Sequence, residues 1–294
     1  MCIRDRVASC IDMYIKGNLP VLDGHGGAGA AAGVFDGIDI DWEYPGVPLM
    51  PYNTISPSDK QNFTLLLAEF RTQLDALGKQ TRKRYLLTAA VNSGAKTTDA
   101  TEPALYARSL DWINLMTYDF SGAWKKTGPT AFHSNLYADP ASPDTDKQSI
   151  DTGVQRFVKL GVPARKLVIG VPFYARGWTG VPSAGYGLYQ SATGPAAGFE
   201  EGAERYSAIA KKTAPKFYHP VTKQLWTYEN GTFWSYDDPL VIKEKADYVK
   251  KKNLGGMMSW SLDQDDAAFS LSKAMLEVLP VSPVPPAARA AAKP

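Results

Sequence analysis

The sequence has few of the residues that build disulfide frameworks or metal sites. Cys2 and Cys10 are its only cysteines, and two cysteines near one end of a chain do not make a disulfide framework. Its three histidines, His25, His133 and His219, are far apart and lack the spacing of metal ligands. We therefore expect a protein without a metal or another cofactor.

Long apolar runs and a strong net charge are also missing. No stretch of roughly eighteen apolar residues occurs, so the sequence predicts no transmembrane helix and no membrane partner. The formal net charge of +2 gives no argument for a nucleic acid as a partner. With 44% hydrophobic and 21% charged residues, the composition is that of an ordinary globular chain.

Aromatic residues are the feature of the composition that stands out, with 7 Trp, 15 Tyr and 11 Phe in the 294 residues. Large rings fill hydrophobic cores, and flat rings also stack on the apolar faces of sugars. Composition alone leaves both interpretations open.

Strand-like and helix-like segments alternate along the chain. Short apolar or alternating runs predict strands at 34–41, 85–91, 112–116, 167–174 and 255–259, and helical periodicity predicts helices at 7–16, 58–76, 146–159, 237–251 and 266–279. Ser58 is the candidate N-cap of the second helix. This alternation implies parallel strands with crossover helices, in a doubly wound sheet or a (β/α)8 TIM barrel. Polar clusters at the carboxyl ends of the strands favour the barrel.

The predicted barrel is incomplete, because only about five of its eight strands are present. The others would precede Val7, and residues 1–6 (MCIRDR) fit neither a signal peptide nor a first strand. We interpret residues 1–33 as an atypical amino end with a partial helix and a Gly/Ala-rich mobile loop or helix start, on a chain truncated upstream. A natural short start is the alternative.

The remaining boundaries follow from changes in pattern. The barrel is expected over 34–178 and 237–280, with a small α+β insertion at 179–236 between its last two strands. Within that insertion, Asn230-Gly231 between two alternating segments is a strong hairpin signal. The Pro- and Ala-rich tail at 281–294 has the composition of a linker.

The chemistry concentrates in the strand at 34–41 and the two residues after it. Because side chains alternate along a strand, Asp39, Asp41 and Glu43 share one face, while Ile38 and Ile40 share the other. Like charges in a shared site raise at least one pKa, so Glu43, the group nearest the mouth, can stay protonated near neutral pH and act as a general acid. The alternative is that these acids cap helices or pair with arginines.

Four motifs carry a resemblance to a known family. Residues 36–43 (DGIDIDWE) match the signature of family 18 glycoside hydrolases, the chitinases and their relatives, and the later motifs agree in order at 116–119 (MTYD), 170–178 (GVPFYARGW) and 255–260 (GGMMSW). The resemblance covers about residues 34–280, and the segment after Trp178 is similar to the insertion of many bacterial chitinases.

The resemblance implies hydrolysis of β-1,4 bonds between N-acetylglucosamine units of chitin, with retention of configuration and help from the substrate's own 2-acetamido group. It implies that Glu43 protonates the glycosidic oxygen and later activates water. Asp41 would orient the acetamido group and stabilise positive charge, and Asp39 would tune Asp41. Tyr118 would hydrogen-bond the acetamido group.

The same resemblance implies a set of residues that bind the sugar chain. This substrate-binding set comprises Trp42, Met116, Asp119, Tyr174, Arg176, Trp260, Trp124, Phe199 and Glu200. For Trp124, Phe199 and Glu200, ordinary packing is the alternative. One departure from the family is that no Ser-x-Gly-Gly stretch precedes the catalytic strand.

Chitin or a chitooligosaccharide is thus the expected partner of a secreted, monomeric chitinase. Two alternatives stay open on the same fold: an endo-β-N-acetylglucosaminidase acting on glycans, and a non-catalytic chitin-binding lectin. The presence of Glu43 argues against the lectin. A sheet with an open edge invites misfolding, so we expect activity from a chain that includes the missing strands.

Overall fold

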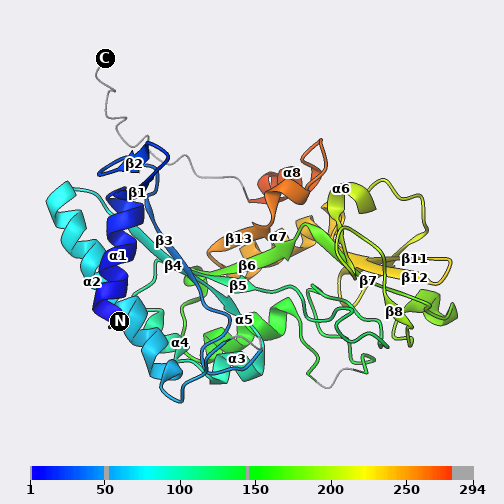
Figure 1. The fold of residues 1–294 in the computed structure, drawn as a ribbon. Helices are drawn as coiled ribbons and strands as arrows, with labels where there is room; N and C mark the ends of the chain where they lie inside the picture. The colour runs from blue at the N-terminus through cyan, green and yellow to red at the C-terminus, as the bar shows by residue number, and fades with distance from the viewer. Residues whose placement is uncertain (1, 50–52, 144–145, 280–294) are drawn as a thin grey trace.

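A five-stranded parallel sheet is the centre of the fold, in a computed structural model that describes residues 2–49, 53–143 and 146–279 (Figure 1). The strand order is β13-β6-β5-β4-β3, and each neighbouring pair is parallel. These strands are β3 (Gly37–Asp41), β4 (Leu86–Asn92), β5 (Trp112–Met116), β6 (Leu167–Pro172) and β13 (Gly256–Trp260). Every residue of β6 is buried, as its continuous apolar run predicts for a parallel strand covered on both faces.

Helices connect the strands and cover the outer face of the sheet (Figure 1). The longer ones are α1 (Ile3–Cys10), α2 (Asp59–Thr81), α5 (Ile150–Lys159), α7 (Pro239–Lys252) and α8 (Ser270–Val278). Shorter helical segments are η1 (Ile11–Ile15), α3 (Ala95–Asp99), α4 (Pro103–Tyr106), η2 (Ala164–Lys166), η3 (Ala184–Gly187), α6 (Tyr206–Ile209) and η4 (Leu262–Gln264). All five predicted helices are present, with ends that differ by a few residues. No helix in the described part of the chain is long and apolar enough to cross a membrane.

Two local predictions are wrong. Ser58 does not cap α2, because its backbone is already helical and its side chain makes no capping hydrogen bond. Instead the Asp59 carboxylate accepts hydrogen bonds from the backbone N–H groups of Ser56 and Gly46, at 2.9 and 3.2 Å. The Gly/Ala-rich segment contains strand β2 (His25–Gly27), which pairs with β1 (Leu19–Leu22) through a two-residue turn whose residues both have positive φ, as Asp-Gly favours.

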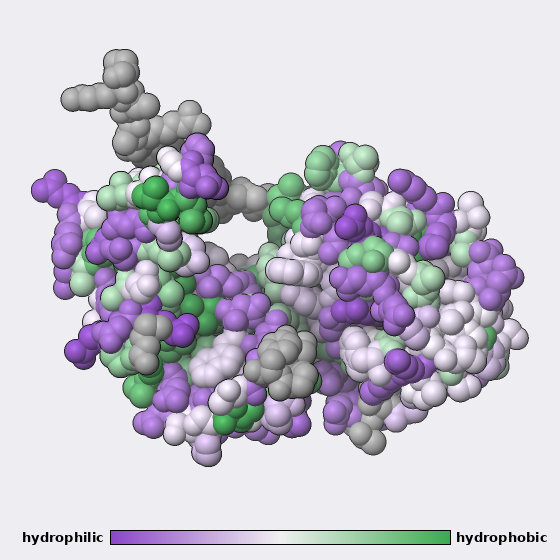
Figure 2. Space-filling view, in the orientation of Figure 1, coloured by the Kyte–Doolittle hydropathy of each residue, from purple (hydrophilic) through white to green (hydrophobic). Residues whose placement is uncertain are grey.

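The parallel sheet is open rather than closed into a barrel. Among the described residues β3 and β13 are its two edges, and they do not pair with each other. Figure 2 shows an open gap between the half of the molecule that carries β1 to β3 and the half that carries β13 and α8. The acidic residues of β3 therefore lie on an edge strand, and this accounts for their exposure. The predicted linker at 281–294 lies outside the described residues.

A second, antiparallel sheet is inserted between β6 and β13 in the chain. Its order is β10-β11-β12-β7-β8, with β9 also paired to β7. The strands are β7 (Tyr174–Thr179), β8 (Gly194–Pro195), β9 (Ala203–Arg205), β10 (Lys216–His219), β11 (Gln224–Glu229) and β12 (Thr232–Tyr236). It begins at Tyr174, ahead of the boundary at residue 179 expected from the sequence. The predicted hairpin is confirmed: Glu229 pairs with Thr232 around Asn230 and Gly231, whose φ values are 49° and 76°.

A buried ion pair lies where the antiparallel sheet meets α7. Lys245 and Asp237 are both fully buried, and the ammonium group donates a hydrogen bond to the Asp237 carboxylate. The same carboxylate also accepts hydrogen bonds from the Ser134 hydroxyl and the Gln224 amide, each at 2.9 Å. A buried charge needs this degree of compensation, since desolvation otherwise outweighs the attraction within the pair.

Replacing Lys245 with methionine should therefore destabilise the protein by about 3–5 kcal/mol, because it leaves the Asp237 charge buried without a counter-charge. The matched control is Lys243→Met on the same helix, where the partner Glu277 is largely exposed and the cost should stay below about 1 kcal/mol. Urea unfolding of the two variants measures both values. Equal destabilisation would contradict a special role for the buried pair.

Candidate active site

The acid column of β3 is present as the alternation predicts. Asp39 and Asp41 are exposed on one face of the strand, whereas Ile38 and Ile40 on the other face pack against the main hydrophobic core. Glu43 follows the end of the strand and is also exposed. The three carboxyl groups thus lie at the carboxyl end of a parallel strand, where sheets of this class bind their ligands.

Trp42 lies apart from this column. Its indole packs edge-to-face against Phe63 of α2, with the ring centroids 5.9 Å apart, and it contacts the main core. The period-two alternation that aligns the acids sends the intervening residue to the opposite face. The expected role of Trp42 in substrate binding gains no support from this position.

Asp39 is held by two polar residues from the next two strands of the sheet. The Thr88 hydroxyl of β4 and the Asn114 amide of β5 both donate to its Oδ1, the latter at 3.2 Å. Asn114 is itself oriented by the Trp112 indole N–H, which donates to its side-chain oxygen at 3.1 Å. Sequence reasoning missed Thr88 and Asn114, although a polar residue within each of two apolar strand runs was a usable signal.

Asp41, in the middle of the column, has a pKa raised to about 6. Asp41 is exposed as a residue, but its carboxyl group is partly desolvated, and this contributes most to the increase, followed by the negative charges of Glu43 and Asp39. A carboxyl group with this pKa holds its proton in mildly acidic solution and releases it near neutrality. Asp41 can therefore change its charge and its hydrogen bonding under conditions in which most aspartates stay ionised.

Tyr118 approaches the column from the end of β5. Burial raises its pKa, and the charges of Asp119, Asp41 and Glu43 raise it further, so its hydroxyl stays a hydrogen-bond donor close to these acids. Gly170 on β6 makes room for its ring, because a Cβ atom there would lie 2.7 Å from Tyr118 Cε1. The ring of Tyr174 packs edge-to-face against that of Tyr118, at 6.2 Å.

A second charged group lies beside Tyr118 and joins the two sheets. The Asp119 carboxylate accepts two hydrogen bonds from the Arg176 guanidinium of β7, both at 2.7 Å. Burial would raise the pKa of Asp119, but interactions with His133 and Arg176 outweigh it and hold that pKa well below its usual range. The guanidinium also lies 5.0 Å from the centroid of the Tyr174 ring and 5.4 Å from that of Trp124.

The other predicted binding residues differ in their burial and in their distance from the acid column. Met116 is buried in a small cluster with Tyr44 that also contacts Tyr118. Trp124 and Trp260 are 56% and 58% exposed, and Trp260 ends β13, so both indoles are open to a ligand.

Phe199 and Glu200 lie in the antiparallel part of the fold, away from these contacts. The Arg205 guanidinium lies over the Phe199 ring, 5.1 Å from its centroid. Glu200 forms an antiparallel backbone bridge with Ala203. Neither contact reaches the acid column, so packing accounts for what the structure shows of these two residues.

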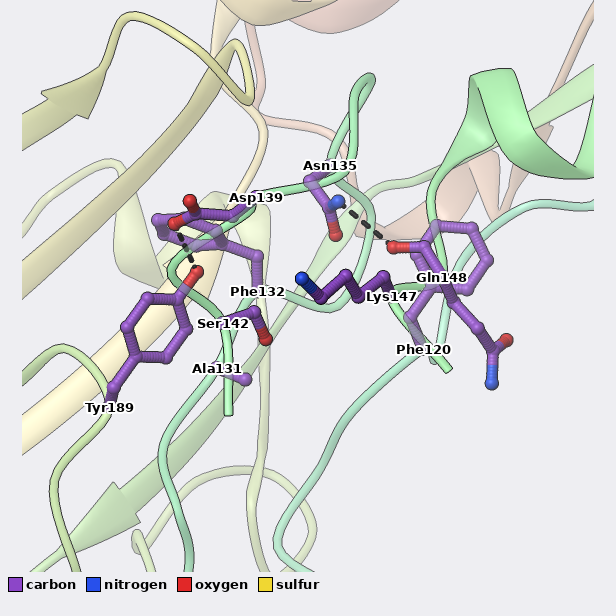
Figure 3. Close-up of a pocket in the computed structure, with 9 residues that line it drawn as sticks. All are labelled: Phe120, Ala131, Phe132, Asn135, Asp139, Ser142, Lys147, Gln148 and Tyr189. Carbon is purple, nitrogen blue, oxygen red and sulfur yellow. Dashed lines mark hydrogen bonds between the residues drawn. The ribbon is translucent and has the colours of Figure 1, made fainter. Parts of the chain in front are cut away.

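A cavity of about 20 Å³ is lined mostly by the loops between β5 and α5 (Figure 3). Its walls include Phe132, Asn135 and Lys147, and the Tyr189 hydroxyl closes it by donating to Asp139 at 2.6 Å. This volume holds about one water molecule and no sugar ring. Within the described ranges, no group of three His, Cys, Asp or Glu side chains could hold a metal ion.

Comparisons with known proteins identify the relatives of this chain. The model of "Glycosyl hydrolases family 18" matches residues 7–265. Chitinase A1 of Niallia circulans is 40% identical over 266 residues, which cover 86% of this chain and 38% of that protein. The catalytic domain of the psychrophilic chitinase B from Arthrobacter TAD20 has a TM-score of 0.89 at 39% identity, over 96% of this chain and 66% of that one.

A class V chitinase from Nicotiana tobaccum, solved as a glutamate-to-glutamine mutant in complex with NAG4, has a TM-score of 0.75 at 31% identity. The match covers 85% of this chain and 70% of that one. The chain thus spans about 38% of the length of the curated relative and 66% of the Arthrobacter domain. The acid column, the aromatic and charged residues around it and the family model lead to one conclusion: the chain belongs to glycosyl hydrolases family 18.

Proposed function

We propose that this protein hydrolyses the β-1,4 bonds of chitin, with Glu43 as the general acid and base. The observation that carries the proposal is the column of Asp39, Asp41 and Glu43 at the carboxyl end of β3, with Asp41 poised at a pKa of about 6. Three carboxyl groups in line at a strand end are electrostatically costly, and proton transfer is the chemistry that such an arrangement serves.

The first step is the protonation of the glycosidic oxygen by Glu43. The carbonyl oxygen of the substrate's acetamido group attacks the anomeric carbon at the same time, and the leaving sugar departs with the proton. The resulting oxazolinium ion is positively charged. Ionised Asp41 stabilises that charge and accepts a hydrogen bond from the acetamido N–H, while Tyr118 donates to the acetamido oxygen.

The second step reverses the role of Glu43. As a carboxylate it removes a proton from water, which attacks the anomeric carbon from the face that the leaving group vacated. Two inversions at one carbon give net retention of configuration. Asp39 stays anchored by Thr88 and Asn114, and its negative charge contributes to the raised pKa of Asp41.

The residues around the column bind the sugar chain. The exposed indoles of Trp260 and Trp124 offer apolar surfaces for sugar faces. The Asp119–Arg176 pair and Tyr174 supply polar groups beside Tyr118. The complex of the Nicotiana tobaccum relative with NAG4 supports a chitooligosaccharide as the ligand class. Because polymeric chitin cannot enter a cell, the proposal includes secretion.

Glu43→Gln should reduce the rate of hydrolysis of a chromogenic N-acetylglucosamine oligomer by about 10²–10⁴-fold, because the amide can neither give nor take the proton. The matched control is Glu229→Gln at the exposed end of β11, which should hydrolyse the oligomer at the rate of the unsubstituted protein. Retained activity in Glu43→Gln would contradict the assignment. Release of products from chitin but not from N-glycans would identify a chitinase rather than an endo-β-N-acetylglucosaminidase. Binding of the oligomer by the unsubstituted protein without cleavage would indicate a lectin.

The electrostatic coupling of the column predicts how Asp41 titrates. Neighbouring negative charges favour its protonated form, so removing one must lower its pKa from about 6 toward 3.8. Glu43→Gln should lower it more than Asp39→Asn, because Glu43 contributes the larger of the two charge effects. Carboxyl-carbon NMR across the pH range measures the midpoints. A midpoint that stays the same or rises in both variants would show that the column is not coupled.

A further inference from the structure

We propose that His133 is a positioning residue: its Nδ1–H donates to the Asp119 carboxylate and fixes that group, together with Arg176, for sugar binding. This inference rests on the proposed function, because it assigns the partner of a residue that would hold the substrate. His133 does not itself reach the acid column, and it acts only through Asp119.

The first observation is the burial of an unsatisfied imidazole. His133 has no exposed surface, and neither of its ring nitrogens has a hydrogen-bond partner among the described residues. Buried polar atoms are almost always paired, because an unpaired one keeps its full desolvation cost. A buried histidine with two unpaired nitrogens therefore points to a polar partner close by.

The second observation identifies that contact. His133 Nδ1 lies 3.6 Å from Asp119 Oδ1, slightly beyond hydrogen-bond distance, and Arg176 Nε already binds the same oxygen at 2.7 Å. Hydrogen bonds in active sites are often long without substrate and tighten in the complex. A shift of Asp119 by a few tenths of an ångström would complete the bond.

The His133 imidazole is held in place by backbone hydrogen bonds and by ring packing. The His133 carbonyl accepts a hydrogen bond from the Phe120 N–H at 3.0 Å, and its own N–H donates to the Ser235 hydroxyl at 3.4 Å. The ring also packs against Tyr174, with the centroids 5.4 Å apart. His133 therefore touches two residues of the proposed sugar site, Asp119 through a nitrogen and Tyr174 through its ring face.

The charge state of His133 suits a hydrogen-bond donor to Asp119 rather than a counter-ion. Burial lowers the pKa of His133 although the charges of Asp119 and Asp237 oppose this, so the imidazole is neutral at neutral pH. Arg176 already neutralises the Asp119 carboxylate. A neutral ring with its proton on Nδ1 adds a hydrogen bond without adding a third charge to the buried group.

Three substitutions separate this role from simple packing. His133→Asn places an amide N–H close to the position of Nδ1, His133→Gln places one close to Nε2, and His133→Phe keeps a ring without a donor. If His133 positions Asp119, the Gln and Phe variants should bind a chitooligosaccharide about ten- to a hundredfold more weakly, and the Asn variant should retain most of the affinity. Calorimetric titration in the Glu43→Gln background measures binding without turnover.

A readout without substrate tests the contact itself. Loss of a donor disfavours the ionised carboxylate, so carboxyl-carbon NMR should find the Asp119 pKa raised in the Phe and Gln variants and still low in the Asn variant. In an Asp119→Asn background, His133→Phe should cause little further loss of affinity, because the two changes remove the same interaction. Thermal unfolding of each variant identifies any that do not fold.

The outcomes distinguish this inference from the proposed function. Equal affinity and equal Asp119 titration in the folded Phe and Asn variants would overturn the positioning role, whatever the protein hydrolyses. Additive losses in the double variant would also overturn it. Failure of the unsubstituted protein to bind or cleave chitooligosaccharides would instead overturn the proposed function, while the titration of Asp119 would still report on His133.

Discussion

Mutual repulsion among the carboxyl groups of Asp39, Asp41 and Glu43 is the constraint that the rest of the site accommodates. Each neighbour of the column relieves part of it: Thr88 and Asn114 donate to Asp39, while Asp41 adjusts through a raised pKa. No arginine or lysine forms an ion pair with these three acids among the described residues, although a cation would remove the repulsion most directly. The column thus keeps the property that proton transfer needs, a carboxyl group whose charge state is close to balance.

The two sheets contribute different chemistry to one place. The parallel sheet supplies the acids and Tyr118 at the carboxyl ends of its strands, as its topology requires. The antiparallel sheet supplies Tyr174 and Arg176 from β7, which follows β6 almost directly. Arg176 reaches back to Asp119 and pairs with it, so this ion pair joins the inserted sheet to the end of β5. The inserted sheet therefore contributes residues to the proposed site.

A buried ion pair supports the loop that carries His133. Asp237, just before α7, pairs with Lys245 within that helix, and Ser134, the residue after His133, donates to the same Asp237. The loop that carries His133 is consequently anchored between two ion pairs, one facing the proposed sugar site and one in the core. Rigid support of this kind is what a binding group needs, because a loosely held carboxylate would lose its geometry and with it much of its effect.

Local sequence pattern determined much of this protein. Period-two alternation aligned Asp39, Asp41 and Glu43, apolar runs located the five parallel strands, and Asn230-Gly231 specified a hairpin, because each of these depends on residues within a few positions of one another. Tertiary structure alone decided the rest. Thr88, Asn114 and His133 lie beside acids on other elements, and partial burial raises the pKa of Asp41, because contact between distant segments sets these properties.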